Sequence, residues 1–215
     1  MKHKAVIFDL DGTLLDTLET LAYYGNQTLE ALGLAPYDKD AYRYMIGNGA
    51  KVLIQRMLKG RDREDLFEKA YSMYIDAYHS NTLYKTEIYP GIKELLEKLR
   101  EKEVKMAVLS NKPHAATVPI IKSFFGSETF AEIRGAMEGV PIKPDPTAVL
   151  EIAQGMHYTP EECLYVGDTA VDMETANRAG FYAVGVLWGF RDRKELEESG
   201  ADCIVANPIE ILMYL

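Results

Sequence analysis

The sequence predicts an α/β fold: a Rossmann-like parallel sheet core with an inserted α-helical cap domain. Three observations support this. From about residue 88 onward, short apolar runs alternate with amphipathic helical patterns, which is typical of a parallel sheet covered by helices on both faces. Runs such as Met106–Leu109 are apolar at every position, as expected for strands buried on both sides. Residues 17–84 contain no convincing strand and have the pattern of helices.

The strands and the clearest helix follow from apolar spacing. In Pro90–Lys102 the apolar residues recur at i, i+3, i+4 and i+7 from Ile92, and Pro90 lies in the opening turn, where proline is tolerated. Six strands are expected from short apolar runs bounded by polar turns: Lys4–Leu10, Val104–Leu109, Phe130–Gly135, Cys163–Gly167, Tyr182–Leu187 and Asp202–Val205.

The inserted segment should form its own small domain above the carboxyl edge of the sheet. Four helices are expected in it, at roughly 17–33, 38–46, 49–59 and 62–82. We therefore expect a core domain of residues 1–15 and 86–215 and a helical cap domain of residues 16–85. The two linkers, at Asp16-Thr17 and Tyr84–Pro90, could act as hinges for opening and closing.

Composition and charge exclude several classes of partner. The chain has 215 residues and a formal net charge of −9, which argues against nucleic acid, because phosphate backbones need a basic surface. No apolar run approaches the roughly 18 residues that span a bilayer, and the first residues are not typical of a signal peptide. Two cysteines do not form a disulfide framework in a chain of this length. We expect a cytoplasmic protein, a monomer or weak homo-oligomer, with no nucleic-acid or membrane partner.

Asp9 and Asp11 are the strongest indication of chemistry. They follow the first apolar run and precede a Gly-Thr turn. Because side chains at i and i+2 of a strand share a face, both carboxylates should face one crevice if the extended geometry lasts through Leu10. Two adjacent anions repel each other unless a cation or a shared proton compensates. A functional role explains this pair better than a role in folding.

Three further polar clusters follow later strands. They are Ser110-Asn111-Lys112-Pro113, Lys143-Pro144-Asp145-Pro146 and Gly167–Asp172. Each taken alone has an ordinary explanation, such as a helix N-cap or a solvated lysine. Four clusters at the carboxyl ends of strands in one sheet, however, are typical of a ligand site in an open α/β fold.

The combined clusters are rich in oxygen ligands. Carboxylates without nearby His or Cys favour Mg²⁺ over zinc or copper, and Mg²⁺ usually takes one or two carboxylates together with substrate phosphate. Lys143 adds a positive charge, and Ser110 and the backbone amides after Asp9 offer hydrogen bonds. The set could hold a phosphate dianion beside a carboxylate that would otherwise repel it.

These residues resemble a known family. Four stretches of the chain resemble, in the same order, the four motifs of the haloacid dehalogenase superfamily of phosphohydrolases. They are Asp9-x-Asp11-Gly12-Thr13, Ser110, Lys143 and Gly167-Asp168-x3-Asp172. The helical insertion resembles the cap of that superfamily, placed between its first and second motifs. Leu109-Ser110-Asn111-Lys112-Pro113 and Gly47-Asn48-Gly49 look most like phosphoglycolate phosphatases.

The resemblance implies a role for each acid. Asp9 would be the nucleophile that attacks phosphorus and forms an aspartyl-phosphate. Asp11 would protonate the leaving alkoxide and then activate the hydrolytic water. The side chains of Asp9 and Asp168 and the backbone carbonyl of Asp11 would bind Mg²⁺, and Asp172 would support the metal indirectly or through water.

The resemblance also implies the phosphate residues, and the sequence itself suggests a specificity site in the cap. Ser110, Asn111 and Lys143 would bind the phosphate, although the sequence leaves open whether Asn111 and its neighbour Lys112 touch the ligand. In the cap, Gly47-Asn48-Gly49 precedes a helix start that could bind a second anionic group such as a carboxylate. A plain glycine-rich turn between two helices explains the same glycines.

The expected function is that of a Mg²⁺-dependent phosphohydrolase of small phosphorylated metabolites, with phosphoglycolate as the best single candidate. A phosphosugar mutase and a pyrophosphatase of the same superfamily are alternatives. A phospho-accepting signalling module is a more distant one, because such modules are about half this length and have no helical cap.

Overall fold

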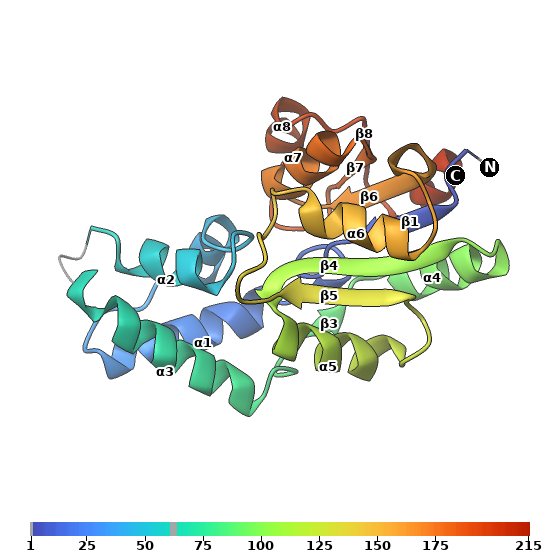
Figure 1. The fold of residues 1–215 in the computed structure, drawn as a ribbon. Helices are drawn as coiled ribbons and strands as arrows, with labels where there is room; N and C mark the ends of the chain where they lie inside the picture. The colour runs from blue at the N-terminus through green and yellow to red at the C-terminus, as the bar shows by residue number, and fades with distance from the viewer. Residues whose placement is uncertain (1, 61–63) are drawn as a thin grey trace.

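A parallel sheet forms the centre of the molecule, as the sequence predicts. The computed structural model describes residues 2–60 and 64–215, and within them the main sheet has six strands in the order β5-β4-β1-β6-β7-β8 (Figure 1). Every neighbouring pair is parallel. The strands are β1 (Ala5–Phe8), β4 (Lys105–Pro113), β5 (Glu132–Ala136), β6 (Cys163–Gly167), β7 (Tyr182–Val186) and β8 (Cys203–Val205).

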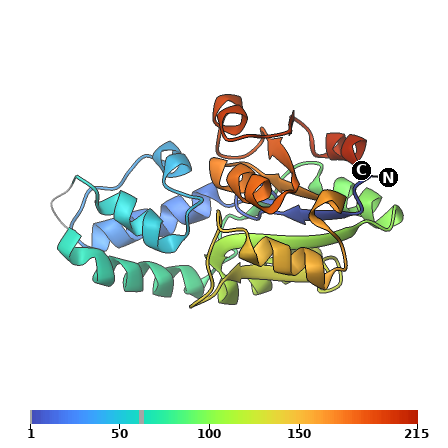
Figure 2. The same ribbon diagram turned by 45° about the horizontal axis from the view of Figure 1, so that its top comes forward.

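Helices cover both faces of this sheet (Figures 1 and 2). Along β1, Val6 and Phe8 belong to one buried cluster, whereas Ala5 and Ile7 belong to another, because successive side chains of a strand point to opposite faces. The first cluster includes side chains of α4 (Ile92–Glu101), α5 (His114–Phe125) and the 3₁₀ helix η4 (Pro208–Tyr214). The second includes side chains of α6 (Thr147–Gly155), α7 (Ala170–Ala179) and α8 (Arg193–Glu198), and the short 3₁₀ helix η3 (Pro160–Glu162) precedes β6.

The inserted segment is helical and lies beyond the carboxyl ends of the strands, opposite the two chain termini (Figure 1). Its elements are α1 (Leu18–Ala31), η1 (Lys39–Tyr44), α2 (Ala50–Leu58), η2 (Glu64–Leu66) and α3 (Phe67–Ser80). The first residues of the helix expected at 62–82 lie outside the described residues, and the helix expected at 38–46 is a 3₁₀ helix capped by the Asp38 side chain. Across residues 2–60 and 64–215, no helix has the length and apolarity needed to cross a bilayer.

A small second sheet, which the sequence does not predict, joins the two linkers of the insertion. Strands β2 (Leu15–Asp16) and β3 (Glu87–Ile88) pair antiparallel, with Leu15 opposite Ile88 and Asp16 opposite Glu87. Two-residue strands are too short for alternation to reveal them. The pairing places the two chain crossings between core and insertion side by side.

Strand β4 continues four residues past its predicted end at Leu109, and this corrects the sequence prediction. Its pairing with β5 shifts register between Leu109 and Pro113 and resumes at Pro113 opposite Ala136. Polar residues are accommodated in this buried extension because they have hydrogen-bond partners; the Ser110 hydroxyl, for example, accepts from the backbone N–H of Lys112 at 3.2 Å.

Candidate active site

The four polar clusters meet at one cavity between the carboxyl edge of the sheet and the inserted helices. Its volume is about 50 Å³. Strands β4, β1 and β6 are neighbours here, and the chain passes to opposite sides of β1, which is where open α/β sheets bind ligands. The sheet side contributes Asp9, Asp11, Ser110, Asn111, Lys112, Pro113, Lys143, Thr169 and Asp172, and the insertion contributes Leu21, Ile46, Gly47, Gly49, Ala50, Leu53, Tyr74, Ile75 and Tyr78.

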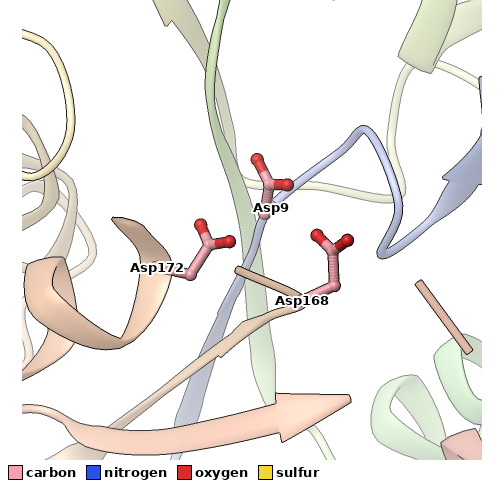
Figure 3. A group of neighbouring side chains, drawn as sticks. All are labelled: Asp9, Asp168 and Asp172. Atoms are coloured by element: carbon pink, nitrogen blue, oxygen red, sulfur yellow. The ribbon is translucent and has the colours of Figure 1, made fainter. Parts of the chain in front are cut away.

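Asp9, Asp168 and Asp172 form a compact group of buried carboxylates (Figure 3). Each offers one oxygen, and these oxygens lie within 4.8 Å of one another. Asp9 follows β1, Asp168 follows β6, and Asp172 lies in the first turn of α7. The backbone N–H of Thr169 donates to Asp172 Oδ2 at 3.1 Å as part of a capping box, and the Thr169 hydroxyl donates to the same oxygen at 2.7 Å, so that carboxylate is fixed. The predicted convergence of residues 9 and 168 is therefore present.

These carboxylates make one another's negative charge unfavourable. Burial raises the pKa of Asp9 to about 7, Asp172 adds repulsion, and Lys143 opposes the shift. Burial also raises the pKa of Asp168 well above its ordinary value, with repulsion from Asp172 and Asp9. A cation in the group would offset this cost. Because the donors are all carboxylate oxygens, the set fits a hard ion such as Mg²⁺.

Lys143 carries the positive charge nearest the nucleophile candidate. Its ammonium donates to Asp9 Oδ1 at 2.6 Å and to Asp172 Oδ1 at 2.7 Å, and all three side chains are buried. Burial lowers the pKa of Lys143, but the attraction of Asp172 and Asp9 outweighs it, so that the pKa lies well above its ordinary value. The ammonium is therefore charged when it meets an anionic ligand.

The side chain of Asn111 holds Lys143 in place. Asn111 Oδ1 accepts from the backbone N–H of Lys143 at 2.9 Å, and Nδ2 donates to the Lys143 carbonyl at 3.0 Å and to the Gly47 carbonyl at 3.1 Å. The sequence predicts a phosphate contact for Asn111. In the structure its amide positions Lys143 and connects the core to the insertion.

Asp11 lines the same cavity as Asp9 but has different hydrogen-bond partners. The predicted shared crevice is thus confirmed, whereas the extended geometry ends at Phe8, before Leu10. The two oxygens of Asp11 accept from Lys112 Nζ at 2.7 and 2.8 Å, and Oδ1 also accepts from the Thr17 hydroxyl at 2.7 Å. Asp11 is thus paired with its own cation, Lys112, whereas Lys143 pairs with Asp9 and Asp172.

The loop after β7 positions Asp168, a role that the sequence does not reveal. The backbone N–H of Phe190 donates to Asp168 Oδ2 at 2.7 Å, and Trp188 Nε1 donates to the Thr13 carbonyl at 2.9 Å. Thr13 in turn donates to Asp168 Oδ1 at 3.3 Å. The only signal in the sequence is a single tryptophan at the carboxyl end of a predicted strand.

The loop Gly47–Gly49 rests on the core. Gly47 and Gly49 line the cavity, and Gly49 is the N-cap of α2, whereas the Asn48 side chain accepts from Arg56 Nη2 at 2.9 Å. Nearby, the guanidinium of Arg191 donates to the carbonyls of Arg43 and Ile46 in the insertion. These contacts hold the insertion over the cavity.

Comparisons with known proteins agree with this site. Residues 6–186 match the family model of haloacid dehalogenase-like hydrolases. A phosphoglycolate phosphatase from Aquifex aeolicus is 36% identical over 212 residues, covering 99% of this chain and 96% of the relative. One from Pseudomonas putida is 35% identical over 208 residues, covering 94% and 76%. A crystal structure from Haemophilus somnus, described as a predicted phosphoglycolate phosphatase, matches with a TM-score of 0.92 and 30% identity, covering 100% of this chain and 98% of that one.

The family match extends over most of the chain, and the four clusters that carry the family motifs converge at one cavity. The chain belongs to the haloacid dehalogenase-like hydrolases and is a phosphatase, a hydrolase of phosphoric monoesters, that resembles phosphoglycolate phosphatases.

Proposed function

We propose that this phosphatase hydrolyses small phosphorylated metabolites with Mg²⁺ through an aspartyl-phosphate on Asp9, and that phosphoglycolate is its substrate. One observation carries the proposal: a carboxylate oxygen of Asp9 lies 2.6 Å from the Lys143 ammonium, in a small cavity that Asp11 and Ser110 also line. The names of the relatives from Aquifex aeolicus and Pseudomonas putida support the choice of substrate.

The proposed chemistry has two steps. A carboxylate oxygen of Asp9 attacks phosphorus, the bond to the ester oxygen breaks, and Asp11 gives its proton to the leaving alkoxide. Asp11 then takes a proton from water, which attacks the aspartyl-phosphate and releases inorganic phosphate with Asp9 restored. Lys143 and the Ser110 hydroxyl would hold the phosphoryl oxygens, and the charge of Lys143 reduces the repulsion between carboxylate and phosphate.

The metal proposal rests on the carboxylate group. Asp9 and Asp168 would hold Mg²⁺ together with the backbone carbonyl of Asp11, and Asp172, already bonded to Lys143 and Thr169, would act indirectly. When bound, the ion would neutralise charge on the phosphoryl group.

The cavity favours a small substrate. Its volume of about 50 Å³ is far below the roughly 300–1,000 Å³ of pockets for drug-sized ligands. We propose that residues 16–85 act as a cap domain on the core of residues 1–15 and 86–215, and that the loop Gly47–Gly49 contributes to specificity. The apolar side chains of the cap, such as Leu21 and Leu53, would keep bulk water away from the phosphoryl group while the hydrolytic water is admitted.

The test is a kinetic panel on the purified chain with Mg²⁺. Phosphoglycolate, ethyl phosphate, glucose 1-phosphate and pyrophosphate are compared by kcat/KM for phosphate release, and phosphoglycolate is expected to lead. Asp9→Asn should lower kcat by a factor on the order of 10⁴–10⁶, as removal of a nucleophile does. Asp76→Asn, the same change on the exposed side of α3, is the control and should leave kcat unchanged.

Two results would contradict the proposal. Turnover that survives in Asp9→Asn would reject the nucleophile. An isomerised hexose phosphate formed without free phosphate would instead identify a mutase.

A further inference from the structure

The cap places an unpaired hydroxyl on the cavity wall. Tyr78 lies on α3, its side chain is 3% exposed, and it lines the cavity. Among the described residues, no protein atom meets its hydroxyl at hydrogen-bonding geometry, although the Lys112 ammonium interacts with it electrostatically. A buried hydroxyl without a partner destabilises the fold, so such groups in native proteins call for an explanation. A ligand that accepts this hydrogen bond would provide one.

The Lys112 ammonium lies next to this hydroxyl. Lys112 Nζ is 5.0 Å from the centroid of the Tyr78 ring, and the lysine is buried. An ammonium has three donors, and the bonds to the two oxygens of Asp11, at 2.7 and 2.8 Å, use two of them. Burial lowers the pKa of Lys112, but the attraction of Asp11 outweighs it and raises the pKa overall, so the lysine is charged.

We propose that Tyr78 and Lys112 together bind the carboxylate of a phosphorylated 2-hydroxy acid, the chemical class to which phosphoglycolate belongs. This inference rests on the proposed function, in which Asp11 protonates the ester oxygen. In such a substrate the carboxylate is separated from that oxygen by a single carbon. Lys112 is bonded to Asp11 and lies beside the Tyr78 ring, so both donors are close to the residue that would meet the ester oxygen.

The other charged groups of the cavity support this assignment. Among the described residues that line it, the cationic side chains are Lys112 and Lys143. Lys143 is bonded to Asp9 and Asp172 at the phosphate end. Lys112 is bonded to Asp11 instead, so it is the cation on the side of the ester oxygen, where a second anionic group of the substrate would lie. Tyr78 adds a neutral hydrogen-bond donor there.

The experiment compares two esters on Tyr78→Phe, which removes the hydroxyl alone. Phosphoglycolate carries the carboxylate, whereas ethyl phosphate has the same two-carbon chain without it. For phosphoglycolate, kcat/KM should fall about tenfold or more, the effect of losing a hydrogen bond to a charged group. For ethyl phosphate it should stay within about twofold, because the remaining contacts are unchanged. Since both esters are assayed on one preparation, the fraction of folded protein cancels from their ratio.

A matched control lies on the same helix. Tyr71→Phe removes a hydroxyl from a partly buried tyrosine of α3 that does not line the cavity. The ratio of kcat/KM for the two esters should not change in this variant. Calorimetry gives a second readout without turnover. Phosphoglycolate should bind Asp9→Asn more tightly than the double variant Asp9→Asn/Tyr78→Phe, while inorganic phosphate binds both alike.

The inference is overturned if the ratio of kcat/KM for phosphoglycolate to kcat/KM for ethyl phosphate is the same in Tyr78→Phe as in the unchanged chain. This result is distinct from failure of the proposed function, in which the unchanged chain would release phosphate from neither ester or Asp9→Asn would stay active.

Discussion

At the scale of single residues, the site depends on close contacts between side chains and backbone. Gly12 shows this most clearly, because its backbone lies directly against the Asp168 carboxylate. A Cβ at position 12 would lie 2.2 Å from Asp168 Oδ2, and the φ of +92° is one that residues with a side chain rarely adopt. The glycine is therefore required for the position of a proposed metal ligand as well as for the turn.

The Gly12→Ala substitution separates these two requirements when compared with Gly33→Ala. Gly33 also has a positive φ, +72°, but a Cβ there meets nothing within 4 Å. Each alanine should lower the free energy of unfolding by about 1–2 kcal/mol through backbone strain. Gly12→Ala should in addition displace Asp168 and abolish Mg²⁺-dependent phosphate release, whereas Gly33→Ala should keep it. Urea unfolding and steady-state assays measure both effects, and full activity in Gly12→Ala would contradict the argument.

At the scale of elements, the sequence predicts the parallel strands well because apolar runs such as Cys163–Gly167 are buried on both faces. It predicts the convergence of Asp9 and Asp168 for the same reason, since neighbouring parallel strands end at one edge. It misses contacts between residues far apart in the chain, such as Lys112 with Asp11, 101 positions away. Tertiary packing alone sets those pairs, and no local pattern encodes them.

Helix α5 contains a proline in its interior, and this predicts a stability change. Pro119 is exposed and lies past the first turn of His114–Phe125, where it lacks the N–H that a helix interior uses. Pro119→Ala should raise the free energy of unfolding by about 2 kcal/mol. The alanine gains helix propensity, and the greater entropy of the unfolded chain without the proline offsets part of that gain. Pro160→Ala is the control, because Pro160 occupies the first position of η3, where no N–H is needed. Urea titration should show no increase in its free energy of unfolding. Equal stabilisation by both variants would reject the explanation.

At the scale of the whole molecule, apolar packing and a few polar contacts around the cavity join the cap to the core. Arg191, before α8, donates to the carbonyls of Arg43 and Ile46, and Asn111 donates to the carbonyl of Gly47. The linkers are joined by the short ladder between β2 and β3. The arrangement of cap on core therefore depends in part on contacts that a single substitution can remove.

The Arg191→Gln substitution should shift the equilibrium between a cap docked on the core and an open cap toward the open one. The charged guanidinium bonds Ile46 at 3.0 Å and is itself paired with Glu195 at 3.1 Å. Loss of a charge-assisted hydrogen bond corresponds to about a tenfold or larger change in the closed population. Amide hydrogen exchange over residues 43–50 should accelerate, and KM for phosphoglycolate should rise by a similar factor, because a ligand that needs the closed state binds in proportion to its population.

The control for this prediction is Arg193→Gln, which removes an exposed ion pair with Glu197 at 3.5 Å within α8 and should change neither measurement. Saturating inorganic phosphate should slow exchange over residues 43–50 in Arg191→Gln, because an anion bound by core and cap together favours closure whatever the state of Arg191. If exchange and KM in Arg191→Gln matched those of Arg193→Gln, packing of the apolar cap side chains, and not these polar contacts, would be what holds the cap closed.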